Sequence, residues 1–414
     1  MKTICLPQSQ CSAMNRGSLA VAASIVMFSF LFPAAHAFQS EGTIRLGSIE
    51  SLTGVSSPYG IQPLNGMKLA IDEVNANGGV MVAGQKVKLQ ITPPEDGYDV
   101  GGDSALTIAL LKKQILDDKV LAVVGPTSSQ ATEVAFNYLN QLVKEGNPIV
   151  LVSPASGAPN LGGISPWAFR NMFFENQIID RELGILSKNF GYKKAAIFVV
   201  KDNAYTVAMA KFTIKPGLER HGFSVVAEAE GMSRDTDFSR QVQAMQREAP
   251  DVIFVSATVQ ATVSFMKEAA RRGLQPKVWV GTVGSLAPEM PSLGGTAVES
   301  LIIGSSYLPG DGPVKALQTA YQKRFSSEIN LFGVNGYEAV YLLKAAIEAA
   351  NIANQPESLG EDRSKLRDAL AKTEIKSVTG ETIRFDAKGD TMKNGYMLTV
   401  RDGQYIEWNQ KPFR

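Results

Sequence analysis

The stretch LAVVGPTSSQATEVAFNYLNQLVKEGNPIVLVSPASGAPN, Leu121 to Asn160, decides the fold because it encodes a strand, a helix and a second strand. Leu121 to Val124 is a short apolar run, typical of a strand buried on both faces of a parallel sheet, and Gly125-Pro126 ends it. From Gln130 to Val143 the apolar residues recur at helical spacing, so this segment predicts an amphipathic helix. Ile149 to Val152 is the second strand.

The loops after these two strands carry small polar residues. Ser128 and Ser129 follow the first strand, and Ser156 and Gly157 follow the second. Parallel strands bring their carboxyl ends to one edge of the sheet, where ligands bind in open α/β folds with help from the positive end of the next helix. Each serine could instead only cap a helix or end a strand. The two roles are compatible, and the pair of loops favours a ligand site.

The N-terminus predicts a secretory signal peptide. Lys2 and Arg16 precede the uncharged apolar run Leu19 to Ala35, which leads into an A-x-A cleavage pattern ending at Ala37. We therefore expect residues 1–37 to be removed and the mature chain to start at Phe38. The alternative is a membrane anchor, although the run is shorter than the roughly 20 residues that a span needs.

Composition excludes several classes of function. Cys5 and Cys11 both lie in the predicted signal peptide, so the mature chain would have no disulfide and no thiol chemistry. Two of the 41 Lys and Arg residues lie in the same segment, which leaves 39 against 40 acidic residues. This balance gives no basic patch for nucleic acid.

The rest of the chain repeats the β-α pattern twice, and a mostly helical segment follows. The polar segment Ser51 to Gly60 is expected to form a loop after the first strand. At 414 residues the chain favours two domains or lobes with parallel sheets. We predict strands at 43–50, 86–92, 167–171, 195–200, 224–229, 252–256, 278–281, 301–305, 382–386 and 395–400. We predict further helices around Met67 to Val74 and at 104–117, 207–221, 238–248, 259–273, 314–325, 335–351 and 364–371.

An enzymatic function finds little support in the sequence. The mature chain holds one histidine, His221, which leaves almost no material for a Ser-His-Asp triad or a His-ligated zinc site. No GxxxxGK[ST], GxSxG, HExxH or EF-hand spacing is present. We therefore expect no catalytic residue, no metal and no cofactor.

Several motifs in order resemble one family, the periplasmic solute-binding proteins of branched-chain amino acid type ABC transporters, also called the Leu/Ile/Val-binding family. The resemblance covers essentially the whole mature chain. It is carried by SLTGVSSPYG, NGMKLAIDEVNANGGV, VLAVVGPTSSQAT, PIVLVSPASGAPNL, FRN at Phe169 to Asn171, DTDFSRQVQAMQREAPDVIF and GVNGYEAVYLLKAAIEAA.

The resemblance implies the type I periplasmic-binding fold, an α/β fold with two Rossmann-like lobes joined by a three-crossing hinge. Lobe 1 would comprise residues 38–171 plus 307–396, and lobe 2 residues 172–306 plus 397–414. The ligand would lie in the cleft between them, and the lobes would close around it by a hinge motion.

The family's ligand contacts can be carried onto this chain residue by residue. The serine that receives the amino-acid carboxylate falls on Ser129, with Ser128 beside it, and the contacts of the second loop fall on Ser156 and Gly157, where the threonine hydroxyl is lost. In lobe 2 the two aromatic contacts fall on Tyr205 and Thr258, and the acid that holds the α-ammonium falls on Val283. These departures predict poor binding of ordinary branched-chain amino acids, unless Glu175, Asp202 or another acid replaces the missing carboxylate.

The resemblance therefore implies a periplasmic, monomeric binding protein that delivers a small solute to an inner-membrane ABC permease. The preferred ligand carries a carboxylate or amide for the serine loops and an apolar or aromatic body near Tyr59, Tyr205 and Val283. One rival is a periplasmic sensor that signals to a partner protein, and another is a secreted enzyme.

Overall fold

The computed structural model describes residues 42–92, 98–310 and 312–411, and the predicted signal peptide lies outside this part of the chain. Two seven-stranded sheets and one small antiparallel sheet make up the strands of the described chain. In the order of hydrogen-bonded neighbours, the first sheet contains β2 (Val80–Val82), β3 (Gln85–Thr92), β1 (Thr43–Glu50), β5 (Ala122–Val124), β6 (Val150–Ser153) and β7 (Ala168–Arg170), with β4 (Tyr98–Asp99) paired to β1.

The second sheet is formed mainly by the middle of the chain, and the C-terminal hairpin completes it. Its order is β17 (Gln404–Glu407), β16 (Tyr396–Arg401), β12 (Leu301–Ser305), β11 (Val278–Gly281), β10 (Val252–Ser256), β8 (Lys194–Val200) and β9 (Ser224–Gly231). The small sheet contains β13 (Glu374–Lys376), β14 (Thr382–Phe385) and β15 (Thr391–Met392).

Both large sheets are parallel at their centres, as the apolar runs predict, and antiparallel at one edge. The strand β2 pairs antiparallel with β3, and β16 pairs antiparallel with both β12 and β17. Each sheet reverses its strand order at its first strand in sequence, β1 in one sheet and β8 in the other. Ligand sites in open α/β sheets lie at such switch points.

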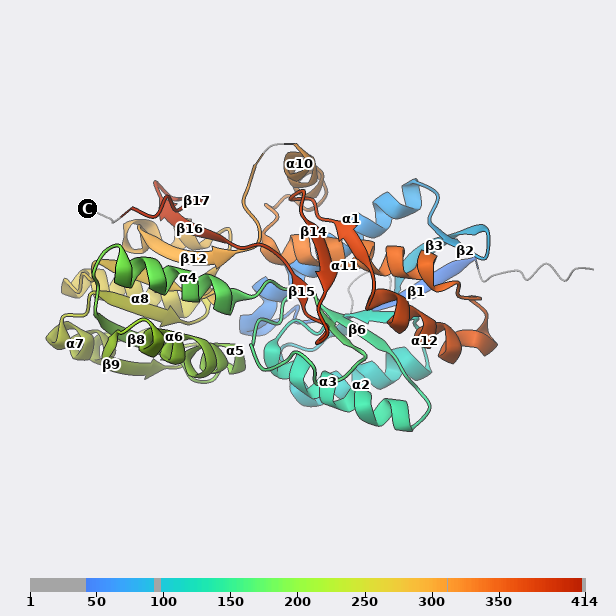
Figure 1. Cartoon of the computed structure of the whole chain (residues 1–414), viewed down its shortest axis with the longest axis horizontal. Coiled ribbons are helices and arrows are strands. Elements are labelled where there is room, and N and C mark those ends of the chain that lie inside the picture. Colours follow the sequence, from blue (N-terminus) through green and yellow to red (C-terminus); the bar gives the residue numbers. More distant parts are fainter. Residues whose placement is uncertain (1–41, 93–97, 311, 412–414) are drawn as a thin grey trace, which may run out of the picture. The chain divides into compact units, whose positions relative to one another are not determined.

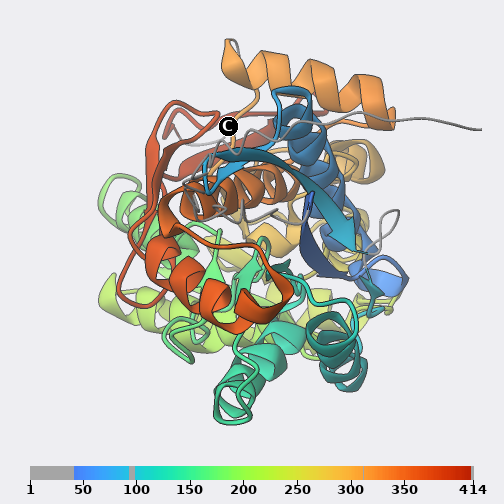
Figure 2. The same ribbon diagram turned by 90° about the vertical axis from the view of Figure 1, so that its right-hand side faces the viewer.

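The helices around the first sheet form two groups. The first group is α2 (Ser104–Leu116) and α3 (Ser129–Lys144), which pack together; the second is α1 (Ser57–Ala76), α10 (Pro313–Phe325), α11 (Leu331–Ala350) and α12 (Leu359–Leu370). The helix α11 packs against α1, and α12 packs against the other side of this pair, on α11. Figure 2 shows the red α12 between the upper helices and the teal α2 and α3, and Arg363 of α12 donates to the Ile115 carbonyl in α2. Helices from both ends of the chain therefore cover one sheet.

The second sheet is likewise covered by two groups of helices (Figure 1). The helix α4 (Glu175–Lys188) packs against α6 (Lys215–Arg220), while α7 (Ser239–Glu248) packs against α8 (Val259–Arg272). The remaining helices are α5 (Ala204–Met209) and α9 (Met290–Gly294). No helix in the described ranges is long and apolar enough to cross a membrane.

The structure corrects some predicted elements. The expected loop Ser51 to Gly60 ends early, since α1 begins at Ser57. Pro58 is tolerated in its first turn, because backbone N–H groups there have no acceptor within the helix. The helix predicted at 207–221 begins at Ala204 and contains a π-helical turn, η2 (Ala210–Ile214). This turn ends two residues before Pro216, which cannot donate a helical hydrogen bond.

Helix α4 was absent from the sequence prediction. Its buried face contains Ile178, Ile179 and Leu183, but it also contains Glu175 and Glu182. The two acidic residues interrupt the apolar stripe by which an amphipathic helix is recognised. Helix α11 also begins earlier than expected, at Leu331, because the Asn330 side chain caps its first turn.

Candidate ligand-binding site

A cavity of about 190 Å³ lies at the carboxyl ends of the central strands of both large sheets. The loops after β1, β5 and β6 form one wall, and the loops after β8, β9, β10 and β11 form the other. The residues that line it are Val55, Ser56, Tyr59, Gly101, Gly102, Thr127, Ser128, Ser129, Gln130, Ala155, Asp202, Asn203, Ala204, Tyr205, Thr206, Ser233, Thr258, Val283, Gly284 and Phe332. Six of the eight site residues expected from the sequence are among them.

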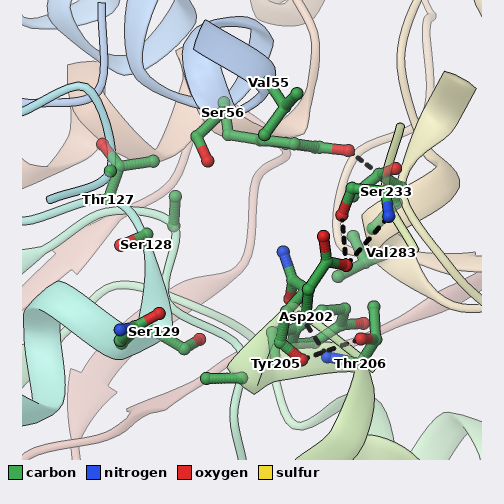
Figure 3. A pocket seen from close by; sticks show the side chains of 18 of the residues that line it. Val55, Ser56, Thr127, Ser128, Ser129, Asp202, Tyr205, Thr206, Ser233 and Val283 are labelled. Atoms are coloured by element: carbon green, nitrogen blue, oxygen red, sulfur yellow. Dashed lines mark hydrogen bonds between the residues drawn. The ribbon is translucent and has the colours of Figure 1, made fainter. Parts of the chain in front are cut away.

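The first-sheet wall presents the N-terminal end of α3 to the cavity (Figure 3). The Ser128 hydroxyl accepts a hydrogen bond from the Ala131 N–H at 3.2 Å, so Ser128 does cap the helix. The buried Ser129 hydroxyl accepts from the Ala158 N–H at 3.2 Å and joins the two serine loops. Both hydroxyls keep a proton to donate, and the helix end is favourable to a negative group.

A buried carboxyl group supports this wall from behind. The Thr127 hydroxyl donates to Glu50, the last residue of β1. Burial raises the pKa of Glu50 well above its ordinary value. This pair was not predicted from the sequence, although an acidic residue at the end of a buried strand is a signal that could have indicated it.

Tyr59 and Phe332 bring aromatic rings to the cavity. The Tyr59 hydroxyl donates to the Gly284 carbonyl at 2.5 Å and accepts from the Val259 N–H at 3.3 Å, so it joins α1 to the loops of the second sheet. The rings of Tyr59 and Phe332 meet edge to face, with centroids 5.5 Å apart. Phe332 was not expected from the sequence, because its helix was predicted to start after it.

The second-sheet wall carries one charged side chain, Asp202, and a buried hydroxyl at Thr258. One Asp202 carboxylate oxygen accepts from both the backbone N–H and the hydroxyl of Ser233, each at 2.8 Å (Figure 3). These two bonds fix the orientation of the carboxylate. Thr258 precedes α8 without capping it by its side chain.

Glu175 lies behind this wall and does not line the cavity. Its carboxylate accepts from the Tyr205 hydroxyl at 2.5 Å and from the Val283 N–H at 2.6 Å. Burial raises its pKa to about 7, and these two hydrogen bonds act in the opposite direction. Glu175 therefore does not offer its carboxylate to a ligand in this arrangement.

Ser156 and Gly157 are not among the lining residues. The Ser156 hydroxyl is buried and bonds to the Ser153 hydroxyl at 2.8 Å and the Thr127 carbonyl at 3.0 Å, so it holds the two loops together. A Cβ atom on Gly157 would lie 3.0 Å from the Tyr205 ring, so a larger side chain there meets that ring.

Buried ion pairs hold the loops and the chain crossings between the sheets. Arg170 binds Asp390 in a two-point contact at 2.6 and 2.7 Å and also donates to the carbonyls of Ser156 and Ala158. Lys393, before β16, pairs with Glu338 of α11. Among the described residues, no group of three or more His, Cys, Asp or Glu side chains could hold a metal ion.

Comparison with known proteins identifies the family. The chain matches the family described as periplasmic binding protein over residues 43–404. It is 26% identical over 380 residues to the Leu/Ile/Val-binding protein BraC3 of Rhizobium johnstonii, an alignment that covers 91% of this chain and 95% of that relative.

Two solved structures have a similar fold. The branched-chain amino acid transporter substrate binding protein LivJ of Streptococcus pneumoniae, in complex with isoleucine, gives a TM-score of 0.71 at 24% identity and covers 88% of this chain and 99% of its own. An ABC transporter solute binding protein of Rhodopseudomonas palustris BisB5, in complex with 3,4-dihydroxy benzoic acid, gives a TM-score of 0.73 at 23% identity. The match covers 89% of this chain and 97% of that one. The family match spans most of the sequence, and the two-sheet α/β fold agrees with it: this chain belongs to the periplasmic binding protein family.

Proposed function

We propose that this protein is the periplasmic solute-binding component of an ABC uptake transporter and that it delivers a small amphipathic solute to an inner-membrane permease. The observation that carries the proposal is the cavity where the carboxyl edges of both large sheets meet. Lobe 1 would consist of residues 38–171 plus 307–396 and lobe 2 of residues 172–306 plus 397–414. The three segments that cross between the sheets would form the hinge.

The preferred ligand carries a carboxylate or an amide. The hydroxyls of Ser128 and Ser129 and the first N–H groups of α3 suit such a group, and the rings of Tyr59 and Tyr205 suit an apolar body. Two solved relatives hold isoleucine and 3,4-dihydroxy benzoic acid, which share a carboxylate and differ in the ammonium. A carboxylate is thus the group that the two ligands have in common, and it supports the preferred class.

A second candidate is an amino acid whose ammonium is held by Asp202. This acid is the one charged side chain that lines the cavity, and its second carboxylate oxygen has no hydrogen-bond partner within the described ranges. The missing family acid at Val283 argues for the first candidate, and Asp202 argues for this one.

A matched pair of probes separates the two candidates. L-leucine and 4-methylpentanoate have the same carbon skeleton and differ by the ammonium. Calorimetry of the mature protein with both probes, and with 4-hydroxybenzoate, tests the preferred class: 4-methylpentanoate or the benzoate should bind at least as tightly as leucine, and Asp202→Asn should leave that affinity unchanged. Tighter leucine binding that Asp202→Asn abolishes selects the amino-acid candidate, and no heat from any probe refutes both.

The signal peptide and the partner require separate tests. N-terminal sequencing of the exported protein should begin at or near Phe38. Uptake of the bound probe into vesicles that contain the permease supports transport, whereas a protein that binds the probe but supports no uptake favours a sensor. Turnover of the probe would favour an enzyme.

A further inference from the structure

The Glu175 carboxylate joins two separate parts of the cavity wall. Tyr205 lies in α5, after β8, and Val283 lies after β11, so the contacts connect loops that are 78 positions apart in the sequence numbering. Each contact is short, at 2.5 and 2.6 Å, and Glu175 is only 3% exposed. A single buried side chain thus fixes a side chain and a backbone segment that both face the cavity.

The ring of Tyr205 is also confined from two sides. A Cβ atom placed on Gly157 or on Gly284 would lie 3.0 Å from opposite edges of the ring. The ring therefore fits between two residues without side chains, and its hydroxyl is engaged by Glu175. What remains for a ligand is the face of the ring, since the hydroxyl proton is already donated.

We propose that Glu175 is a positioning residue for the ligand cavity, which holds the Tyr205 ring and the backbone at Val283 in the arrangement that receives the solute. This inference rests on one part of the proposed function, namely that the cavity is the site where the solute binds. Glu175 begins α4, immediately after the chain has left the first sheet at Arg170, so it links the crossing segment to the cavity wall.

Glu182 provides a matched control on the same helix. It is fully buried two turns further along α4, both of its carboxyl oxygens lack a hydrogen-bond partner in the described part of the chain, and it does not line the cavity. Tyr205 from α5 is the titratable group that bonds to Glu175, whereas the charge of Glu175 helps to raise the pKa of Glu182. No described Lys or Arg pairs with Glu175. Replacement of either acid by glutamine removes one buried carboxyl group at nearly constant shape.

The test compares Glu175→Gln with Glu182→Gln, using L-leucine and 4-hydroxybenzoate as probes in calorimetry between pH 6 and 8. In Glu175→Gln the amide oxygen can still accept from the Val283 N–H. The amide nitrogen is a donor, so it cannot replace the carboxylate oxygen that accepts from the Tyr205 hydroxyl. We expect on the order of tenfold weaker binding for Glu175→Gln and a change below about twofold for Glu182→Gln. Wild-type affinity should rise as the pH increases through 7, because the ionised carboxylate accepts both bonds, and this pH dependence should disappear in Glu175→Gln but not in Glu182→Gln.

Amide exchange measured by NMR gives a readout that needs no ligand. The Val283 amide should exchange faster in Glu175→Gln, because a neutral amide oxygen is a weaker acceptor than a carboxylate. A folded Glu175→Gln protein with wild-type affinity and wild-type pH profile overturns the inference. If neither probe binds the wild-type protein, the proposed ligand classes fail, and unchanged Val283 exchange then overturns the positioning role by itself.

Discussion

Replacing Asp390 with alanine should destabilise the fold strongly. Its carboxylate makes two contacts with the Arg170 guanidinium, at 2.6 and 2.7 Å, and both side chains are less than one-tenth exposed. Removing one partner of a buried ion pair leaves an uncompensated charge, at a cost of about 3 to 5 kcal/mol. Two charge-assisted hydrogen bonds, at about 1.5 to 3 kcal/mol each, give about 3 to 6 kcal/mol, which overlaps this range. This is a large fraction of a typical folding free energy of about 5 to 15 kcal/mol.

Equilibrium unfolding in urea, followed by circular dichroism, measures this loss. Glu374→Ala is the matched control, because Glu374 pairs with Arg384 at 3.6 Å on the surface, where both side chains are more than half exposed. An exposed pair contributes about 0 to 1 kcal/mol. A loss below about 1 kcal/mol for Asp390→Ala, with an unchanged denaturant slope, would refute the reasoning. The double variant Arg170→Met with Asp390→Leu should be more stable than Asp390→Ala, since no buried charge is left unpaired.

Three further predictions concern the serines, the pH and the crossing segments. Alanine at both Ser128 and Ser129 should weaken solute binding by about 1 to 3 kcal/mol and lower the melting temperature; if the serines only cap α3, calorimetry will show unchanged affinity. Because burial raises the pKa of Glu175 from 4.5 to about 7, the folded state binds its proton more tightly than the unfolded state. The contribution of Glu175 to the free energy of unfolding should therefore fall by about 3 kcal/mol as the pH rises from about 4.5 through 7. The melting temperature of Glu175→Gln should fall less than that of the wild type across that range. Lys393→Met should lower the free energy of unfolding in urea by about 3 to 5 kcal/mol, because it leaves the buried Glu338 carboxylate without its cation. A stability equal to wild type would contradict a structural role for the pair.

The central strands could be predicted closely from the sequence. The strands at Thr43–Glu50, Val252–Ser256 and Leu301–Ser305 have the bounds that their apolar runs indicate. A strand buried on both faces needs a continuous apolar run, and turn residues interrupt such a run at each end. Helix α4 could not be predicted in this way, because Glu175 and Glu182 occupy its buried face.

The parts of the candidate site that depend on local chain order could be predicted from the sequence. The parts that depend on contacts between distant residues could not. The serine loops follow directly from the strand-helix-strand pattern. The contact between Tyr59 and Gly284 spans 225 positions, and no local pattern indicates it. The ligand contact that the resemblance implied for Ser156 could not be judged from the motif alone. Its hydroxyl bonds to Ser153 and to the Thr127 carbonyl, and the motif does not show these contacts.

The late position of β16 has a consequence for how the chain acquires its structure. This strand, Tyr396–Arg401, pairs with β12 in the second sheet, while α11, Leu331–Ala350, packs against α1 beside the first sheet. Neither half is a continuous segment, so a growing chain cannot complete either half until nearly all of it has left the ribosome. A chain of this design reaches its last residues while its apolar strands are still incompletely covered. For the export proposed above, this late completion of both sheets would keep the chain in an extended state that can pass through a narrow pore.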